Sequence, residues 1–197
     1  IKILTIIILV SIQTINAYSN NIDNNYNLYV KLPLIPKTHI LTIKTKYLEE
    51  KNNYKYMFSI KSSSLTNLIT KVDGEGYVFG SIDKGFYLPE EYSYSFIRND
   101  KEKFYNIFFD NKNVSQIIIN PDYDRHKLSE LLDSMLLSVI DPASMFLTLD
   151  TLPDNKCIEN ISVFDGKRRY NLNITPYSVS DEYIVCKAEQ VKIGGFK

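Results

Sequence analysis

The chain has 197 residues, of which 44% are hydrophobic and 23% charged, so it can form one domain with a real core or at most two small ones. Lys plus Arg and Asp plus Glu both number 23, a balance that excludes the electrostatic footprint of a protein binding nucleic acid or an anionic membrane. The 15 tyrosines, with only 7 Gly and 7 Pro, favour strands.

Residues 1–17 have the pattern of a secretory signal peptide. Lys2 precedes an apolar run over residues 3–12, which is shorter than the roughly 20 residues of a membrane helix. Ala17 offers a small residue for cleavage before Tyr18, and a buried first strand is the alternative interpretation. We therefore expect a periplasmic protein with no stable transmembrane anchor after cleavage, in which residues 18–197 form a single domain.

The two ends of the sequence carry a further expectation. The chain begins without Met and ends at Gly194–Lys197 without a closing element. We expect the natural chain to start earlier and its C-terminus to be truncated here.

After a polar lead-in over residues 18–27, which we expect to be loose, side chains alternate with period two from about residue 28 to residue 120. Turn signals divide this stretch at residues 50–53, 83–85, 99–101 and 110–113. The pattern predicts an antiparallel meander with an aromatic face and a Lys, Ser and Thr face.

The period then changes to that of helices. Apolar residues between Leu128 and Ile140 follow the spacing of an amphipathic helix, whose start Asp122 or Asp124 could cap. Asp141-Pro142 predicts a second helix that ends before Pro153. Four apolar residues of this second helix are expected to face inward: Ala143, Met145, Phe146 and Leu149.

Strands are expected again at about residues 158–164, 167–175 and 181–192. Asp165-Gly166 predicts a tight hairpin turn in which both residues have φ > 0. The predicted fold class is mainly β (α+β), with a strongly curved antiparallel sheet or half-barrel meander wrapped around a helical hairpin.

Cys157 and Cys186 are the two cysteines of the chain, and in an oxidising compartment they predict one disulfide. A redox pair or a metal site is the alternative, which the lack of Cys-x-x-Cys and of a nearby His disfavours.

The titratable residues indicate no catalytic residue, metal site or cofactor. His39, and the series Asp122, Asp124 and His126, are better explained by surface positions and helix capping than by metal binding. Glu90-Glu91 and Asp181-Glu182 are neighbours on strands and point to opposite faces.

Glycines and cations offer two more motifs. Gly74, Gly76 and Gly80 lie among strand residues, so they indicate bulges or sharp bends rather than a dinucleotide site. The three cations of residues 167–169 could bind an acidic partner, but they fit better as a charged edge that prevents aggregation, with Arg168 and Arg169 keeping it soluble.

Three motifs resemble an exported proteobacterial family catalogued as domain of unknown function 3108. They are the hairpin of residues 163–172 between Cys157 and Cys186, the segment 141–147, and the Gly-rich strand with Pro and aromatic residues of 76–92. The resemblance covers roughly residues 38–195. It implies a curved sheet or half-barrel holding helices, like the periplasmic carriers that shuttle lipoproteins and bind acyl chains, and it implies no catalytic residues.

The leading functional hypothesis is a non-enzymatic periplasmic protein that binds a hydrophobic ligand, such as an envelope lipid or lipoprotein, between sheet and helices. A structural or assembly partner of an envelope protein, acting through the sheet edge or the basic hairpin, is the alternative, and an enzyme is a third. No nucleic-acid partner is expected. The candidate lining residues are Tyr56, Phe58, Phe79, Tyr94, Phe96, Met135 and Phe146.

Overall fold

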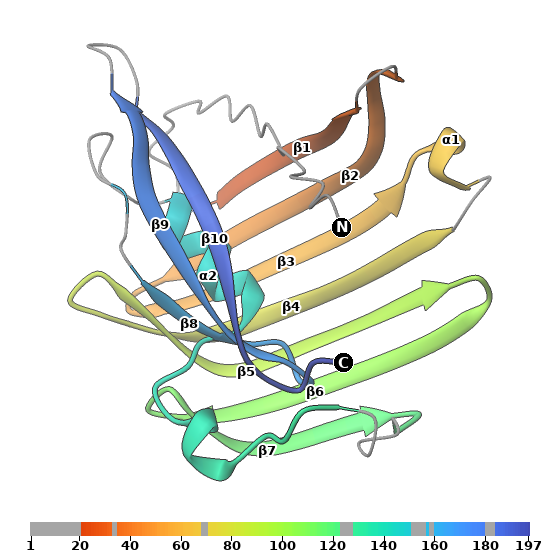
Figure 1. The fold of residues 1–197 in the computed structure, drawn as a ribbon. Coiled ribbons are helices and arrows are strands. Elements are labelled where there is room, and N and C mark those ends of the chain that lie inside the picture. The colour runs from red at the N-terminus through yellow and green to blue at the C-terminus, as the bar shows by residue number, and fades with distance from the viewer. Residues whose placement is uncertain are drawn as a thin grey trace.

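The structure, a computed structural model, describes residues 21–32, 35–67, 71–122, 128–150, 157, 160–179 and 184–197. The predicted signal peptide lies outside these residues. Within them the fold is mainly β and antiparallel, as predicted, and the sheets do not close into a barrel (Figure 1).

The larger sheet is a curved meander of seven strands that pair in sequence order. Each of the four turns predicted from the sequence lies between two of its strands. The strands are β1 (Asn21–Leu32), β2 (Ile35–Glu50), β3 (Asn53–Ser62), β4 (Val72–Asp83), β5 (Phe86–Arg98), β6 (Lys101–Asp110) and β7 (Asn113–Asn120). A short helix, α1 (Ser64–Asn67), follows β3.

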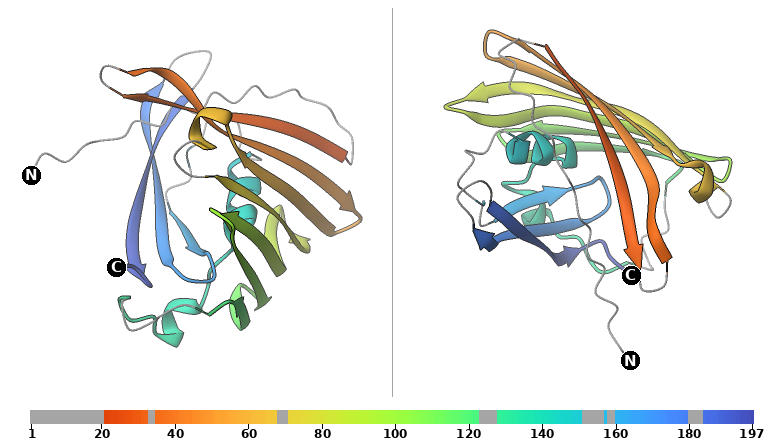
Figure 2. Two further views of the ribbon diagram at one scale, coloured as in Figure 1. Left: turned by 90° about the vertical axis from the view of Figure 1, so that its right-hand side faces the viewer. Right: turned by 90° about the horizontal axis from the view of Figure 1, so that it is seen from above.

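The smaller sheet has three strands in the order β10-β9-β8 and faces the concave side of the larger sheet (Figure 2). Its strands are β8 (Ile161–Phe164), β9 (Arg169–Val179) and β10 (Ile184–Gly194). Helix α2 (Pro142–Asp150) lies between the two sheets and packs on β4, β5 and β8. The α1 end of the larger sheet extends beyond both α2 and the smaller sheet (Figure 2).

The polar lead-in is not loose where the structure describes it, because β1 begins at Asn21 and pairs with β2. Its side chains alternate between half-buried and exposed positions from Ile22 to Leu28. An edge strand needs only one apolar face, so Asn25 and Asn27 can lie at exposed positions without cost to the sheet, whereas Asn24 is half-buried on the other face.

The predicted helix over residues 128–140 is wrong, and the expected helical hairpin is reduced to α2. Residues 133–136 form one turn of 3₁₀ helix, and the flanking backbone bonds to distant segments. Ser129 N–H donates to the Phe196 carbonyl at 2.6 Å, and Val139 N–H donates to the Lys112 carbonyl at 2.8 Å. Ile140 forms a bridge with Val163 of β8, so the segment joins the two sheets instead of coiling on itself.

The start of α2 agrees with the predicted Asp-Pro signal. Asp141 is fully buried, and its Oδ1 accepts hydrogen bonds from Ala143 N–H at 2.8 Å and Ser144 N–H at 2.9 Å. These bonds satisfy donors that the first turn of a helix leaves open. Ala143 and Met145 point inward as expected, whereas Phe146 is 52% exposed. The buried face of α2 is centred on Ser144, and Phe146 lies on the opposite side of the helix, so the predicted inward position of Phe146 is wrong.

The glycines of β4 mark a bend, as the sequence indicated. The register shifts between Phe79 and Gly80, opposite Pro89 of β5. A Cβ at Gly80 would lie 2.1 Å from the Leu88 carbonyl oxygen, and one at Gly76 would lie 2.5 Å from the Ser93 carbonyl oxygen. The two strands can therefore approach this closely because these positions lack side chains.

The β8–β9 hairpin forms, but its loop is longer than predicted. Phe164 pairs with Arg169, so the loop consists of four residues. The prediction gave both Asp165 and Gly166 a positive φ, but of these two residues Gly166 alone has one. Asp165 Oδ1 accepts hydrogen bonds from the backbone N–H groups of Lys167 and Arg168, which closes the loop as an Asx turn. The predicted disulfide joins Cys157 to Cys186, with their Cα atoms 6.1 Å apart.

Candidate functional site

The concave face of the larger sheet is organised in rows of side chains that cross the strands. Residues paired directly across neighbouring strands share one face, so the register defines each row. Row 1 is Ile22, Tyr47, Tyr56, Val78, Tyr92, Ile107 and Ile117. Row 2 is Asn24, Thr45, Phe58, Gly76, Tyr94, Tyr105 and Ile119. Row 3, toward the α1 end, is Tyr26, Ile43, Ile60, Gly74, Phe96 and Lys103.

Row 1 belongs to the protein core. Tyr56, Val78 and Tyr92 are buried in a cluster that also contains Ala143 and Leu147 of α2. The pocket beside this cluster, next to Leu147, has a volume of about 40 Å³, which is room for about one water molecule. Side chains therefore fill this part of the space between α2 and the sheet.

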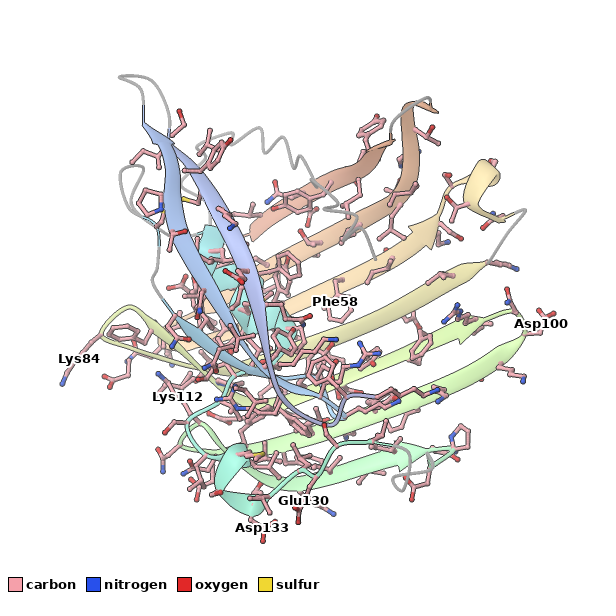
Figure 3. The ribbon with its side chains drawn as sticks, viewed as in Figure 1. Phe58, Lys84, Asp100, Lys112, Glu130 and Asp133 are labelled. Atoms are coloured by element: carbon pink, nitrogen blue, oxygen red, sulfur yellow. A yellow bond between two sulfur atoms is a disulfide. The ribbon has the colours of Figure 1, made fainter. Side chains whose placement is uncertain are left out.

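Row 2 lies at the margin of the part of the larger sheet that α2 and the smaller sheet cover. Phe58 and Tyr94 are half-buried and pack against the core cluster, and Tyr105 is buried. Gly166, at the tip of the β8–β9 loop, lies over Tyr105, because a Cβ on this glycine would be 2.7 Å from the Tyr105 ring. Figure 3 shows Phe58 beside the place where β10 crosses in front of the larger sheet.

Five aromatic rings of rows 1 to 3 form one stacked group. Tyr94 is central, with its ring centroid 4.8 Å from that of Tyr105 and 5.8 Å from that of Phe96, both in stacked orientation. Phe58 stacks on Tyr92 at 6.2 Å, and Tyr92 contacts Tyr94 at 5.4 Å. The group connects the buried row 1 with the more accessible row 3.

Row 3 is apolar but lies outside the core. Ile43, Ile60 and Phe96 are half-buried, and none of the described residues that form the two core clusters or pack on them comes from this row. Gly74 adds no side chain between Ile60 and Phe96 in this row. The row ends at Lys103, the cross-strand partner of Phe96.

The structure brings together four of the seven predicted lining residues. Tyr56, Phe58, Tyr94 and Phe96 share the concave face, although Tyr56 is a core residue. Phe79 points to the convex face, since it alternates with the buried Val78, and it is 37% exposed. Met135 lies next to Gly194 rather than beside the aromatic group, and Phe146 is exposed on α2.

A basic pocket of about 350 Å³ lies beside the β8–β9 loop. It is lined by Leu128, Lys167, Arg168, Lys192, Gly195, Phe196 and Lys197. Sequence reasoning missed this site because its residues come from three separate segments. Lys103 was also missed, although counting back by two from Tyr105 places it on the inner face of β6.

The cations of residues 167–169 do not form the solubilising edge that the sequence suggested for Arg168 and Arg169. Arg169 is buried, and its guanidinium donates to the Met135 carbonyl at 2.9 Å, the Asn171 Oδ1 at 2.6 Å and the Ser162 Oγ at 2.9 Å. Arg168 is exposed in the loop, so only this cation keeps the predicted surface position. The difference arises because β9 is the central strand of its sheet and not an edge.

The buried carboxyl group of Asp141 and the half-buried carboxyl group of Asp165 lie near the aromatic rings. Burial raises the pKa of Asp141 to about 6, although hydrogen bonds from Ser144 and Ala143 act in the opposite direction. Burial also raises the pKa of Asp165, against the hydrogen bonds from the backbone of Arg168 and Lys167. The pKa of Tyr94 is raised mainly by burial, then by Tyr105 and Asp165, while the charge of Arg168 lowers it.

The other titratable candidates are not brought together. The His39 ring nitrogen lies 3.0 Å from the Leu41 carbonyl and 3.1 Å from the Thr42 hydroxyl. Glu90 is exposed, whereas Glu91 accepts hydrogen bonds from Tyr77 and Asn106. Asp124, His126 and the pair Asp181-Glu182 lie outside the described residues, among which no group of three or more His, Cys, Asp or Glu could hold a metal.

The fold and the rows define an open half-barrel with an apolar concave face. No family model, no curated protein and no solved structure matches the chain. The resemblance to the exported family of unknown function stays a prediction. Within the residues that the structure describes, no helix has the length and apolar character needed to cross a membrane.

Proposed function

We propose that this protein is a non-enzymatic periplasmic protein that binds the acyl chain of an envelope lipid or lipoprotein along row 3. The observation that carries the proposal is the row itself, an apolar strip with half-buried Ile43, Ile60 and Phe96 that no described element covers. Five strand positions from Ile43 to Lys103 span about 20 Å at the usual strand spacing. That length suits an extended long acyl chain.

The site differs from the one expected from the sequence. Side chains of row 1 pack against α2, so the proposed ligand lies beyond the helix, at the α1 end of the sheet (Figure 2). Gly74 contributes no side chain to row 3, and a Cβ there would lie 3.1 Å from the Phe96 Cβ, so Phe96 lies close over β4 at this point of the row. Phe58 and Tyr94 would form the inner wall of the site, and Lys103 supports an amphiphile with a negative group at this end.

The test is binding of a fluorescent fatty acid to the purified protein, together with native mass spectrometry after export and lipid extraction. Phe96→Ala should weaken binding about tenfold, since it removes one large apolar contact. Phe79→Ala is the matched control on the convex face and should leave binding unchanged. Wild-type protein that carries no lipid and does not bind the probe would overturn the proposal.

A second candidate function follows from the edge of the smaller sheet. The side chains from Val185 to Ile193 of β10 are all exposed, and among the described strands β10 pairs with β9 alone. Such an edge can accept a strand from an envelope protein. Gln190→Pro would remove an outward-pointing N–H group from this edge, because the neighbouring Val191 pairs with Asn171 on the β9 side. Affinity capture from envelope extract with unchanged partners would exclude this function.

A further inference from the structure

The basic pocket concentrates positive charge in a chain whose formal net charge is zero. Four cationic side chains line it, from Lys167, Arg168, Lys192 and Lys197, and the described residues of the lining include no Asp or Glu. Desolvation lowers the pKa of Lys167, and repulsion from Arg168, Lys103 and Lys197 lowers it further, against the charge of Asp165. An anion in the pocket would relieve this repulsion.

The carboxyl group of the β8–β9 loop is already engaged. Asp165 Oδ1 accepts the two backbone hydrogen bonds that close the loop, and Oδ2 lies 4.0 Å from Arg168. The side chain of Asp165 therefore holds the loop in shape, and the loop in turn presents Lys167 and Arg168 at the pocket.

An aromatic ring holds two of the cations in place. The Arg168 guanidinium carbon lies 5.8 Å from the centroid of the Phe196 ring, and the Lys192 Nζ lies 5.2 Å from it. Cation–π contacts of this kind orient a cation while leaving its N–H groups available to an anion. Phe196 is itself anchored, because its backbone N–H donates to the Ser129 hydroxyl at 3.0 Å.

The pocket lies next to the end of row 3. Lys103 is the last residue of the row, and its charge acts on Lys167 in the pocket. The loop that carries Lys167 rests on Tyr105, whose ring stacks with Tyr94 and Phe96. An amphiphile with its chain on row 3 would thus have its polar end at these cations.

We infer that the basic pocket binds the anionic head group, a phosphate or a carboxylate, of the amphiphile whose acyl chain lies on row 3. This inference rests on the proposed function. Arg168 would contribute a guanidinium fork that suits either anion, and Lys167 and Lys192 would contribute point charges.

The test compares three probes by titration calorimetry: monododecyl phosphate, dodecanol and inorganic phosphate. Wild-type protein should bind monododecyl phosphate about tenfold or more tightly than dodecanol, as expected for charge-assisted hydrogen bonds. The double variant Arg168→Gln, Lys192→Gln should lose this preference and still bind dodecanol as the wild type does. The control Lys44→Gln, Lys46→Gln changes the net charge equally on exposed positions of β2 and should keep the preference.

The outcomes separate the two proposals. Equal binding of both dodecyl probes by the wild type would overturn the head-group inference and leave the acyl-chain proposal standing, whereas no binding of either would overturn both. Inorganic phosphate that binds as tightly as monododecyl phosphate would show a site for a free anion and would also overturn the inference. Lys192→Gln alone keeps the test informative if the double variant melts at a lower temperature.

Discussion

The Tyr54 hydroxyl lies 3.0 Å from the Ser144 Oγ, a hydrogen bond that joins β3 to the first turn of α2. Ser144 Oγ donates to Asp141 Oδ2, so Tyr54 donates to Ser144 when Asp141 is ionised. All three residues are buried. The protonation state of Asp141 is therefore coupled to the packing of the helix on the larger sheet.

Stability should fall as pH rises from about 4 to about 6. The pKa of Asp141 is raised from 3.8 to about 6 in the folded state, so the folded protein binds the additional proton and is favoured at low pH. The free energy of unfolding should decrease by about 3 kcal/mol across this window and stay low above it. Denaturant unfolding at a series of pH values measures the decrease.

Asp141→Asn is the variant that isolates this effect. An Asn Oδ1 can accept the same bonds from the N–H groups of Ala143 and Ser144, so the variant should be more stable than the wild type at pH 8 and about equal at pH 4. Asp133→Asn, on an exposed residue, should keep the wild-type profile. A parallel pH profile for Asp141→Asn and wild type would refute the assignment.

Alanine substitutions of the neighbouring residues Arg169 and Arg168 should have very different effects on stability. Arg169→Ala would leave the Met135 carbonyl and the Ser162 and Asn171 side chains without their guanidinium partner, so we expect a loss of roughly 2–4 kcal/mol in stability. Arg168→Ala, on an exposed side chain, should change stability by less than about 0.5 kcal/mol. Thermal melts of the two variants make the comparison, and equal losses would contradict the assigned roles.

Gly76 should not tolerate a methyl group. Its Cβ would lie 2.6 Å from both the Phe58 ring and the Tyr94 Cβ, so Gly76→Ala should cost about 2 kcal/mol or more and disturb the stacked rings. Gly74→Ala is the graded control, because its closest contacts would be 3.1 Å and the neighbours need move less. Near-ultraviolet circular dichroism reports on the tyrosines, and a larger effect at Gly74 would count against this packing.

The disulfide should contribute to stability and not to ligand binding. It joins two cysteines with a sequence separation of 29, and the chain-entropy model gives roughly 3–4 kcal/mol for a loop of this length. Reduction, or the pair Cys157→Ala and Cys186→Ala, should therefore lower the melting temperature while acyl-probe binding at low temperature is kept. Free thiols in protein taken from the periplasm would contradict a structural disulfide.

Local chemistry was sufficient to predict the four turns of the larger sheet, the antiparallel meander, the Asp141 cap and the cysteine pair. Each depends on a few adjacent residues, such as Asp83-Lys84-Gly85, or on alternation with period two. The same reasoning predicted a helix over residues 128–140, where the apolar spacing was correct but the backbone partners were not. Phe196, Lys112 and β8 satisfy the N–H and C=O groups there, so tertiary bonds replaced helical ones.

The candidate site depended on the three-dimensional arrangement in a way that no local pattern could reveal. The alternation assigned Phe58, Tyr94 and Phe96 to one face, but only the register between strands joined them to Lys103 in rows. The basic pocket unites Leu128, Lys167 and Lys192 from distant parts of the chain. Alternation is set by the local geometry of a strand, whereas register, coverage by α2 and the meeting of charges result from long-range packing.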